Sequence, residues 1–231
     1  MKIGFCGIVV ENEFYGGKTM RTQEQVHEIV RRLEEEYPLA ECTLDYKKDY
    51  ELLFSVRLAA QCTDARVNMI TPALFERFPT LQSFAEADAA EVGEYVRSCG
   101  FFNSKARDIV AAARMLIDDY GGVVPDTMEE LLKLPGVGRK TANLILGDVY
   151  KVPGSTVVDT HCIRISNRLG LVDDLKEPEK IERELRRILP PDKSSDFCHR
   201  IVLHGRAVCT ARKPNCEECC LKDVCQSFEA P

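Results

Sequence analysis

Four cysteines near the carboxyl end have the spacing of a metal site. Cys209, Cys216, Cys219 and Cys225 follow the pattern C-x6-C-x2-C-x5-C. A loop this short has too few apolar residues for a core of its own, so a bound metal would have to hold it folded. The spacing alone is compatible with a four-cysteine zinc site and with a [4Fe–4S] cluster, and disulfides are a third alternative.

A basic loop, residues 210–215, lies between the first two of these cysteines and carries Arg212 and Lys213. Metal ligands at both ends would present the two cations rigidly to a phosphate, and a solvated surface loop is the alternative. We interpret Cys220 as a bystander, because two consecutive side chains rarely face one small cluster. The remaining six cysteines lie among apolar neighbours and are expected in the core.

The segment LPGVGRK, residues 134–140, has the composition of a tight turn between two helices. Gly136 and Gly138, on either side of Val137, allow the backbone to bring its N–H groups close to an anion at the positive end of the following helix. With Pro135 ending the preceding helix, the segment indicates a helix-hairpin-helix, which grips a nucleic-acid phosphate without contacting the bases.

Lys140 follows this turn, in the first turn of a helix and beside Arg139. The helix dipole and the neighbouring cation both disfavour the charged ammonium, and a neutral lysine amine is a nucleophile. A solvated lysine is the alternative. Asp159 precedes another helix and is expected to cap it, where its carboxylate stays ionised and can face a developing cation. Residues 150–158 can span about 30 Å, enough to return Asp159 to Lys140. We expect His161 to pack.

Two further loops have side chains suited to a disrupted base stack. Gln61 lies in LAAQCTD, residues 58–64, at the end of one helix, and Phe101 lies in GFFNSKA, residues 100–106, before a basic helix start. A glutamine and an apolar side chain on loop tips can fill the gap that a displaced base leaves. Taken alone, Phe101 and Phe102 would be assigned to the core, and we expect at least one of them there.

The overall charge of the chain, unlike the motifs above, does not favour a nucleic-acid partner. The formal net charge of −6 argues against binding by bulk positive charge. Segments 97–114, 133–168 and 198–213 nevertheless carry +3, +4 and +4, so a basic face is expected on an acidic chain. We see no stretch approaching the roughly 18 apolar residues of a membrane span and no leader pattern. These features predict a reduced, cytoplasmic location, where clustered cysteines bind metal.

Helical spacing of apolar residues predicts an all-α fold. We expect Thr22 to cap a first helix, Thr71-Pro72 to start a helix separate from the one at Asp64, and Asp126 to form a capping box with Glu129 for residues 127–133. Residues 3–10 are a possible short strand. A further helix is expected to begin after Asp49. The remaining expected helices cover 80–86, 88–97, 103–119, 139–149, 159–169, 179–189 and 195–207.

The motifs LAAQCTD, GFFNSKA, LPGVGRKTAN and VDTH, followed by the cysteine pattern, resemble the endonuclease III family of DNA glycosylases over residues 21–228. The resemblance implies a [4Fe–4S] cluster rather than zinc. It also implies a six-helix domain over 42–152 with the helix-hairpin-helix, and a second domain formed by 21–41 and 153–231. Independently of the resemblance, we expect residues 1–20 to be a poorly ordered extension, and a misassigned start codon, with Met20 as the true start, is the alternative. The implied partner is double-stranded DNA with damaged bases or abasic sites, bound by a monomer.

The family pattern places its nucleophilic lysine on Lys140, its catalytic aspartate on Asp159 and its gap-filling glutamine on Gln61. Its wedge position, commonly leucine, matches Phe101. The implied activity removes oxidised pyrimidines and cuts the strand 3′ to the lesion by β-elimination. An adenine-specific mismatch glycosylase, which would lack the lysine, and a non-catalytic DNA-binding module are the alternatives. The implied DNA contacts are Gly136, Val137, Gly138, Arg139, Arg212 and Lys213, and the implied cluster ligands are Cys209, Cys216, Cys219 and Cys225.

Overall fold

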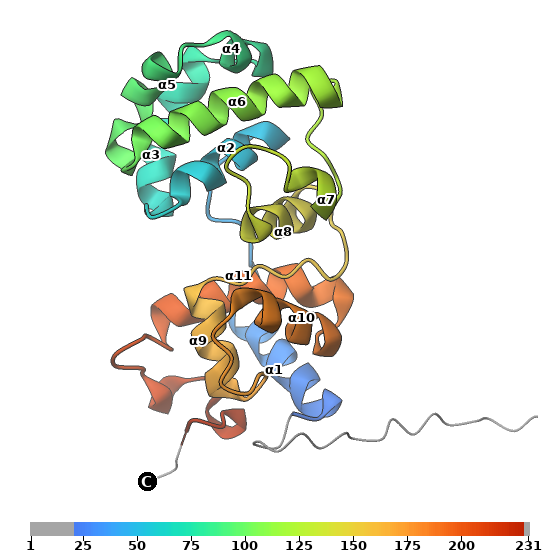
Figure 1. Ribbon diagram of the computed structural model, residues 1–231. Coiled ribbons are helices and arrows are strands. Elements are labelled where there is room, and N and C mark those ends of the chain that lie inside the picture. The colour runs from blue at the N-terminus through green and yellow to red at the C-terminus, as the bar shows by residue number, and fades with distance from the viewer. Residues whose placement is uncertain (1–20, 229–231) are drawn as a thin grey trace, which may run out of the picture.

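The computed structural model describes residues 21–228, and within that range every regular element is a helix, which confirms the all-α prediction. Figure 1 shows two lobes, with α2 to α8 in the upper one and α1, α9, α10 and α11 in the lower one. None of the described helices is long and apolar enough to cross a membrane. The α-helices are α1 (Gln23–Glu36), α2 (Asp49–Ala59), α3 (Asp64–Arg77), α4 (Leu81–Glu86), α5 (Ala89–Val96), α6 (Phe102–Tyr120), α7 (Met128–Leu131), α8 (Arg139–Asp148), α9 (Thr160–Leu169), α10 (Pro178–Ile188) and α11 (Ser194–Ala207). The short 3-10 turns are η1 (Arg97–Cys99), η2 (Pro191–Lys193), η3 (Cys216–Glu218) and η4 (Lys222–Val224).

The upper lobe is built around α6, against which α4 and α5 pack. Its core is apolar and aromatic, and Phe54 of α2 meets Phe84 of α4 edge to face with the ring centroids 5.0 Å apart. Such a pair adds to the free energy gained from burying the two rings. Ile109 and Leu116 complete the buried side of α6. This lobe supplies a rigid base for the loops at its edge.

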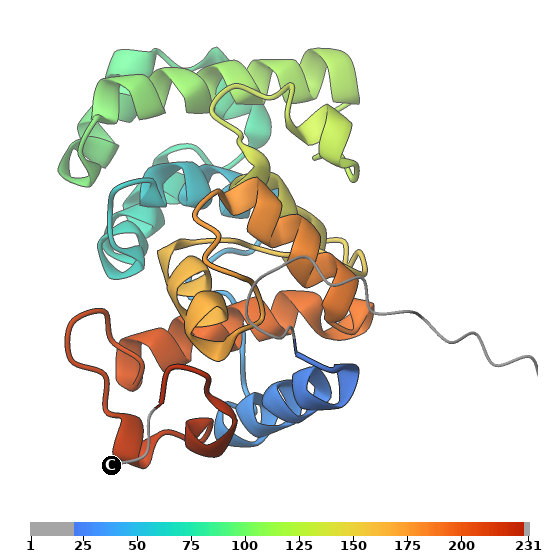
Figure 2. The same cartoon turned by 60° about the horizontal axis from the view of Figure 1, so that its bottom comes forward.

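The lower lobe joins the two ends of the described chain, because α1 packs against α11 (Figures 1 and 2). Thr22 forms the expected cap of α1, in a reciprocal capping box with Gln25. The buried stripe of α1 consists of Val26, Ile29, Val30 and Leu33. Residues 37–48 and 149–159 connect the lobes, and α8, which packs against α2 in the upper lobe, also contacts α11.

Two local expectations were wrong. Thr71-Pro72 does not start a helix: α3 begins after the cap Thr63 and runs through Pro72, which costs one backbone hydrogen bond. Both flanking turns are held in the core by Val67 and Leu74, so the helix continues. The cap of α7 is Thr127, which accepts from the Glu130 N–H, and not the neighbouring aspartate. The expected strand at 3–10 and the extension at 1–20 lie outside the described residues.

Candidate functional site

A cavity of about 340 Å³ brings together three of the residues singled out from the sequence. Lys140 at the start of α8, Asp159 at the start of α9 and Gln61 at the end of α2 all line it. Its walls come from both lobes, since α2, α3 and α8 face α9 and α11 across it. The cavity therefore holds an amine and a carboxylate from opposite lobes, where an extruded group could enter between them.

The turn before α8 uses its two glycines differently. Gly136 has a φ of +76°, and a Cβ there would lie 2.7 Å from Nε and 2.8 Å from Cδ of Arg57. Only glycine fits that position. Gly138 has an extended φ of −110° and caps α8 without a side-chain hydrogen bond, and a Cβ there would meet open space. The first N–H groups of α8 thus lack a side-chain cap, which is the arrangement that binds anions at helix N-termini.

Arg139 and Lys140 have different surroundings. The Arg139 guanidinium donates to Glu182 of α10 through Nε at 3.0 Å and Nη2 at 2.6 Å. Glu182 is buried, and its hydrogen bond raises the pKa of Arg139. The Lys140 side chain is exposed at the cavity. The predicted DNA contact Arg139 therefore links α8 to α10 in this structure, which the sequence did not indicate.

Asp159 caps α9, since its Oδ1 accepts from the Cys162 N–H at 2.7 Å. The buried segment Val157-Val158 leads into it and fixes the direction from which the chain enters the helix. His161 follows on the cavity wall, with Nδ1 3.1 Å from Nη2 of Arg164. Burial is the main cause that lowers the pKa of His161. His161 was expected only to pack, yet it faces the same cavity as the predicted catalytic pair.

An ion pair across the cavity was also missed by the sequence analysis. Arg206 of α11 lies 3.0 Å from Oδ2 of Asp64, at the start of α3. The same oxygen accepts from the Thr43 hydroxyl at 2.6 Å, so one carboxylate joins the upper lobe, the lower lobe and the connection between them. Asp64 stands within LAAQCTD, but the sequence held no signal that Arg206 would be its partner.

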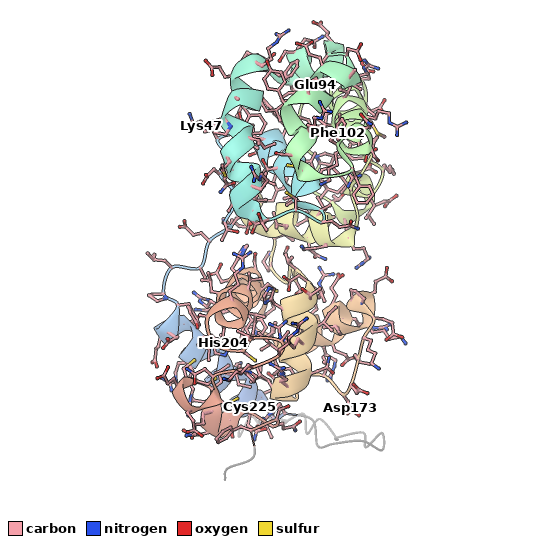
Figure 3. The ribbon with its side chains drawn as sticks, turned by 90° about the vertical axis from the view of Figure 1, so that its left-hand side faces the viewer. Lys47, Glu94, Phe102, Asp173, His204 and Cys225 are labelled. Carbon is pink, nitrogen blue, oxygen red and sulfur yellow. The ribbon has the colours of Figure 1, made fainter. Side chains whose placement is uncertain are left out.

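Gln61 and Phe101 both stand on exposed loop tips in a strained backbone conformation. Their φ angles are +57° and +47°, in the left-handed region that side chains other than glycine rarely adopt. Phe101 is 72% exposed, whereas Phe102 is half-buried against Gly93 of α5. Phe102 is labelled in Figure 3, among the helices of the upper lobe. Of the two aromatic residues, Phe101 is the exposed one.

The four predicted cysteine ligands line a second cavity, of about 250 Å³, in the lower lobe. Figure 3 shows His204 and Cys225 at this end of the molecule. The sulfur atoms receive hydrogen bonds: Arg168 donates to Cys209 at 3.2 Å, and the Leu221 N–H donates to Cys219 at 3.4 Å. Hydrogen bonds from Cys220, and then from His204, hold the pKa of Cys219 well below its usual range.

The donors around this cysteine cavity fit an iron–sulfur cluster. A zinc ion, bonded at about 2.3 Å to each sulfur, draws four cysteines into a tight tetrahedron. Four thiolates around a common cavity, with N–H donors aimed at two of the sulfurs, fit the larger [4Fe–4S] group.

Arg212 and Lys213 are exposed on the loop between the first two cysteines. Arg168 holds this loop by donating to the carbonyls of Thr210 at 2.8 Å and Ala211 at 3.0 Å. In Figure 1 the loop after α11, the end of α2 and the start of α6 all lie on the left-hand side of the molecule. The basic loop and the two strained loops thus share one side.

Comparison with known proteins agrees with this geometry. Residues 54–191 match the model of the HhH-GPD superfamily of base excision DNA repair proteins, which is the class that the fold and the hairpin define. Residues 209–225 match the iron–sulfur binding domain of endonuclease III. The chain belongs to the endonuclease III family. It is a DNA glycosylase and abasic-site lyase of base excision repair, and its cofactor is a [4Fe–4S] cluster.

Relatives and solved structures cover almost the whole chain. Endonuclease III of Synechocystis sp. is 45% identical over 92% of this chain and 97% of its own length. Endonuclease III of Escherichia coli is 38% identical over 87% of this chain and 95% of its own. A trapped covalent intermediate of endonuclease III with DNA matches with a TM-score of 0.84 at 39% identity, covering 90% of this chain and 98% of that one.

Proposed function

We propose that Lys140 is the nucleophile and Asp159 the electrostatic partner of a bifunctional glycosylase that removes oxidised pyrimidines from double-stranded DNA. The observation that carries this proposal is the single cavity that the two side chains line from opposite lobes. A target nucleotide flipped out of the duplex would enter between them. Gln61 and Phe101 would fill the gap left in the stack, and the first turn of α8 with Arg212 and Lys213 would hold phosphates.

The reaction follows from these positions. The Lys140 amine attacks the sugar C1′, the bond from C1′ to the base breaks, and the base leaves with the electron pair and takes up the proton that the amine gives up. The Asp159 carboxylate stabilises the positive charge that develops on the sugar, as a carboxylate does in glycoside cleavage. The C1′–O4′ bond of the resulting aminal then breaks as the ring oxygen takes up a proton, which leaves a protonated Schiff base at C1′. The Schiff base acidifies C2′, so loss of a C2′ proton expels the 3′ phosphate, breaks the C3′–O bond and cuts the strand 3′ to the lesion.

The cluster has a structural role in this proposal. Cys209, Cys216, Cys219 and Cys225 would bind it and so hold the basic loop, and base removal needs no electron transfer. We also propose that the domains are 42–152 and 21–41 with 153–231, and that the protein works as a cytoplasmic monomer held at the nucleoid through DNA. Sedimentation of the protein with and without a 20-base-pair duplex would test the monomer.

Borohydride trapping tests the chemistry. The protein is incubated with a duplex containing thymine glycol or an abasic site and then reduced, and a covalent adduct on a denaturing gel is the expected result. Lys140→Ala should abolish the adduct. Lys133→Ala is the matched control, because Lys133 is an exposed lysine on the hairpin paired with Glu130, and it should leave the adduct unchanged. An undiminished adduct with Lys140→Ala would place the nucleophile elsewhere.

A further inference from the structure

Lys105 is a buried cation outside the cavity that holds the proposed catalytic pair. It lies in the first turn of α6, and only 1% of its surface is exposed. Burying a lysine costs free energy unless its ammonium is well partnered, and here burial lowers the pKa of Lys105. No step of the proposed reaction uses this side chain. Because burying this charge costs free energy, we expect Lys105 to have a structural or functional role.

The partners of Lys105 indicate that role. Its Nζ donates to the Leu58 carbonyl at 2.8 Å and to the Cys99 carbonyl at 2.7 Å. Leu58 lies in the last turn of α2, and Cys99 is the last residue of η1. Carbonyls at helix ends lack partners within their helix and carry the negative end of the helix dipole, so a cation stabilises them. One ammonium therefore joins the carboxyl ends of α2 and η1, which are far apart in sequence.

The loops that follow these two helix ends carry the residues with a strained backbone, Gln61 and Phe101. Gln61 follows Leu58 by three residues, and Phe101 follows Cys99 by two. The Cys99 thiol also donates a hydrogen bond to Cys62 in the other loop, and burial, followed by this hydrogen bond, raises the pKa of Cys99 to about 11. A left-handed backbone at a residue other than glycine is strained and persists only where the surroundings enforce it.

We propose that Lys105 is a positioning residue for base extrusion: by joining the carbonyls of Leu58 and Cys99, it holds Gln61 and Phe101 at the spacing at which both can enter the base stack together. This role rests on the proposed function of the two loops and adds to it a residue that does not touch the DNA. Without the ammonium the loops of Gln61 and Phe101 move apart. Insertion of one side chain into the base stack then no longer places the other side chain for insertion.

The role predicts a specific defect. Lys105→Met keeps the length of the side chain and removes the charge and the donors. Single-turnover excision of thymine glycol should fall about tenfold or more. Cleavage of a preformed abasic site should fall less than about threefold, because a nucleotide without a base is easier to extrude. In a Phe101→Ala background, Lys105→Met should slow excision less than about threefold, since residues acting through one step are not additive.

A control separates this role from general loss of charge. Arg107→Met removes a cation from the same helix, but Arg107 is exposed and donates to the Asn103 carbonyl of its own helix at 3.2 Å. We expect normal excision from it. Lys105→Arg keeps the charge and the donors and should recover part of the excision rate. Lys105→Gln serves the same comparison if the methionine variant does not fold.

A binding measurement makes the inference independent of the chemistry. In a duplex with 2-aminopurine beside a tetrahydrofuran abasic analogue, loop insertion unstacks the fluorophore and raises its emission. Lys105→Met should reduce this rise at saturating protein. Equal losses of excision and abasic cleavage, additive with Phe101→Ala, would overturn the inference, and so would an unchanged fluorescence rise. A wild-type protein that gives the fluorescence rise but no adduct would refute the proposed chemistry and leave the role of Lys105 standing.

Discussion

Asp159 has two separable roles, as the cap of α9 and as a charge facing the cavity. Asparagine caps helices as well as aspartate does, so Asp159→Asn loses only the interaction of the charge with the helix dipole, about 0.3–1 kcal/mol. Asp159→Ala also loses the hydrogen bond from the Cys162 N–H, worth about 1 kcal/mol. At about 2–4 °C per kcal/mol for a chain of this size, the melting temperature falls by about 1–4 °C for asparagine and about 3–8 °C for alanine.

Excision should follow a different order. Both variants lose the carboxylate charge, so single-turnover removal of thymine glycol should fall by about 10²-fold or more in each. Calorimetry and excision kinetics on the same preparations measure the two effects. Thr80→Ala is the control, because it removes the cap of α4, far from the cavity, and should lower the melting temperature without slowing excision. Near-normal excision by Asp159→Asn would reduce Asp159 to a helix cap.

Three further outcomes are expected. Arg139→Met should cost about 1–2 kcal/mol in urea denaturation, because it removes two hydrogen bonds to the buried Glu182. Arg139→Met should leave the salt dependence of DNA binding unchanged. Lys213→Met should reduce the slope of the logarithm of the binding constant against the logarithm of the salt concentration by about one. An equal reduction with Arg139→Met would mean that Arg139 binds phosphate. Burial lowers the pKa of His161, so between its folded and unfolded pKa values the unfolded chain binds a proton that the folded chain excludes. Stability should therefore fall as the pH drops below about 6.5, and a His161→Gln variant that showed the same fall in urea midpoint between pH 7.5 and 5.5 would contradict this. Oxidative removal of the cluster should open the 209–225 loop to proteolysis, since Leu221 is its one deeply buried residue in the described structure, and a loop that stayed resistant after loss of the cluster's visible absorption would refute the structural role.

The sequence predicted those features that depend on local pattern. Apolar spacing gave the helix positions, and the cap at Asp159 followed from a carboxylate placed between an apolar run and a helix. The errors were local competitions between adjacent residues: Thr127 rather than its neighbour caps α7, and burial on both sides carries α3 through Pro72. Pairings between distant residues left no local trace. The ion pair of Arg206 with Asp64 is one case.

Two glycines show the same contrast between what local sequence predicts and what only helix packing explains. Gly136 was predicted from its place in a Gly-x-Gly turn, and its positive φ agrees with that prediction. Gly205 lies inside α11, where glycine lowers helix stability, and the sequence offered no reason for it. In the structure a Cβ at Gly205 would collide with Nδ1 of His161, so the residue allows α9 to approach α11 closely. Only the packed helices reveal that requirement.

The pairing of α1 with α11 has a consequence for how the protein is made. The upper lobe, α9 and α10 come between them in the chain, so the ribosome completes α1 roughly 170 residues before it completes α11, about 9–34 s earlier at ordinary rates of synthesis. The apolar stripe of α1 stays without its final cover during that time, while α2 to α8 can fold on one another. The cysteine loop follows α11 in the chain. The lower lobe therefore closes only after α11 has been made, and the cluster can bind only after its four cysteines have been made.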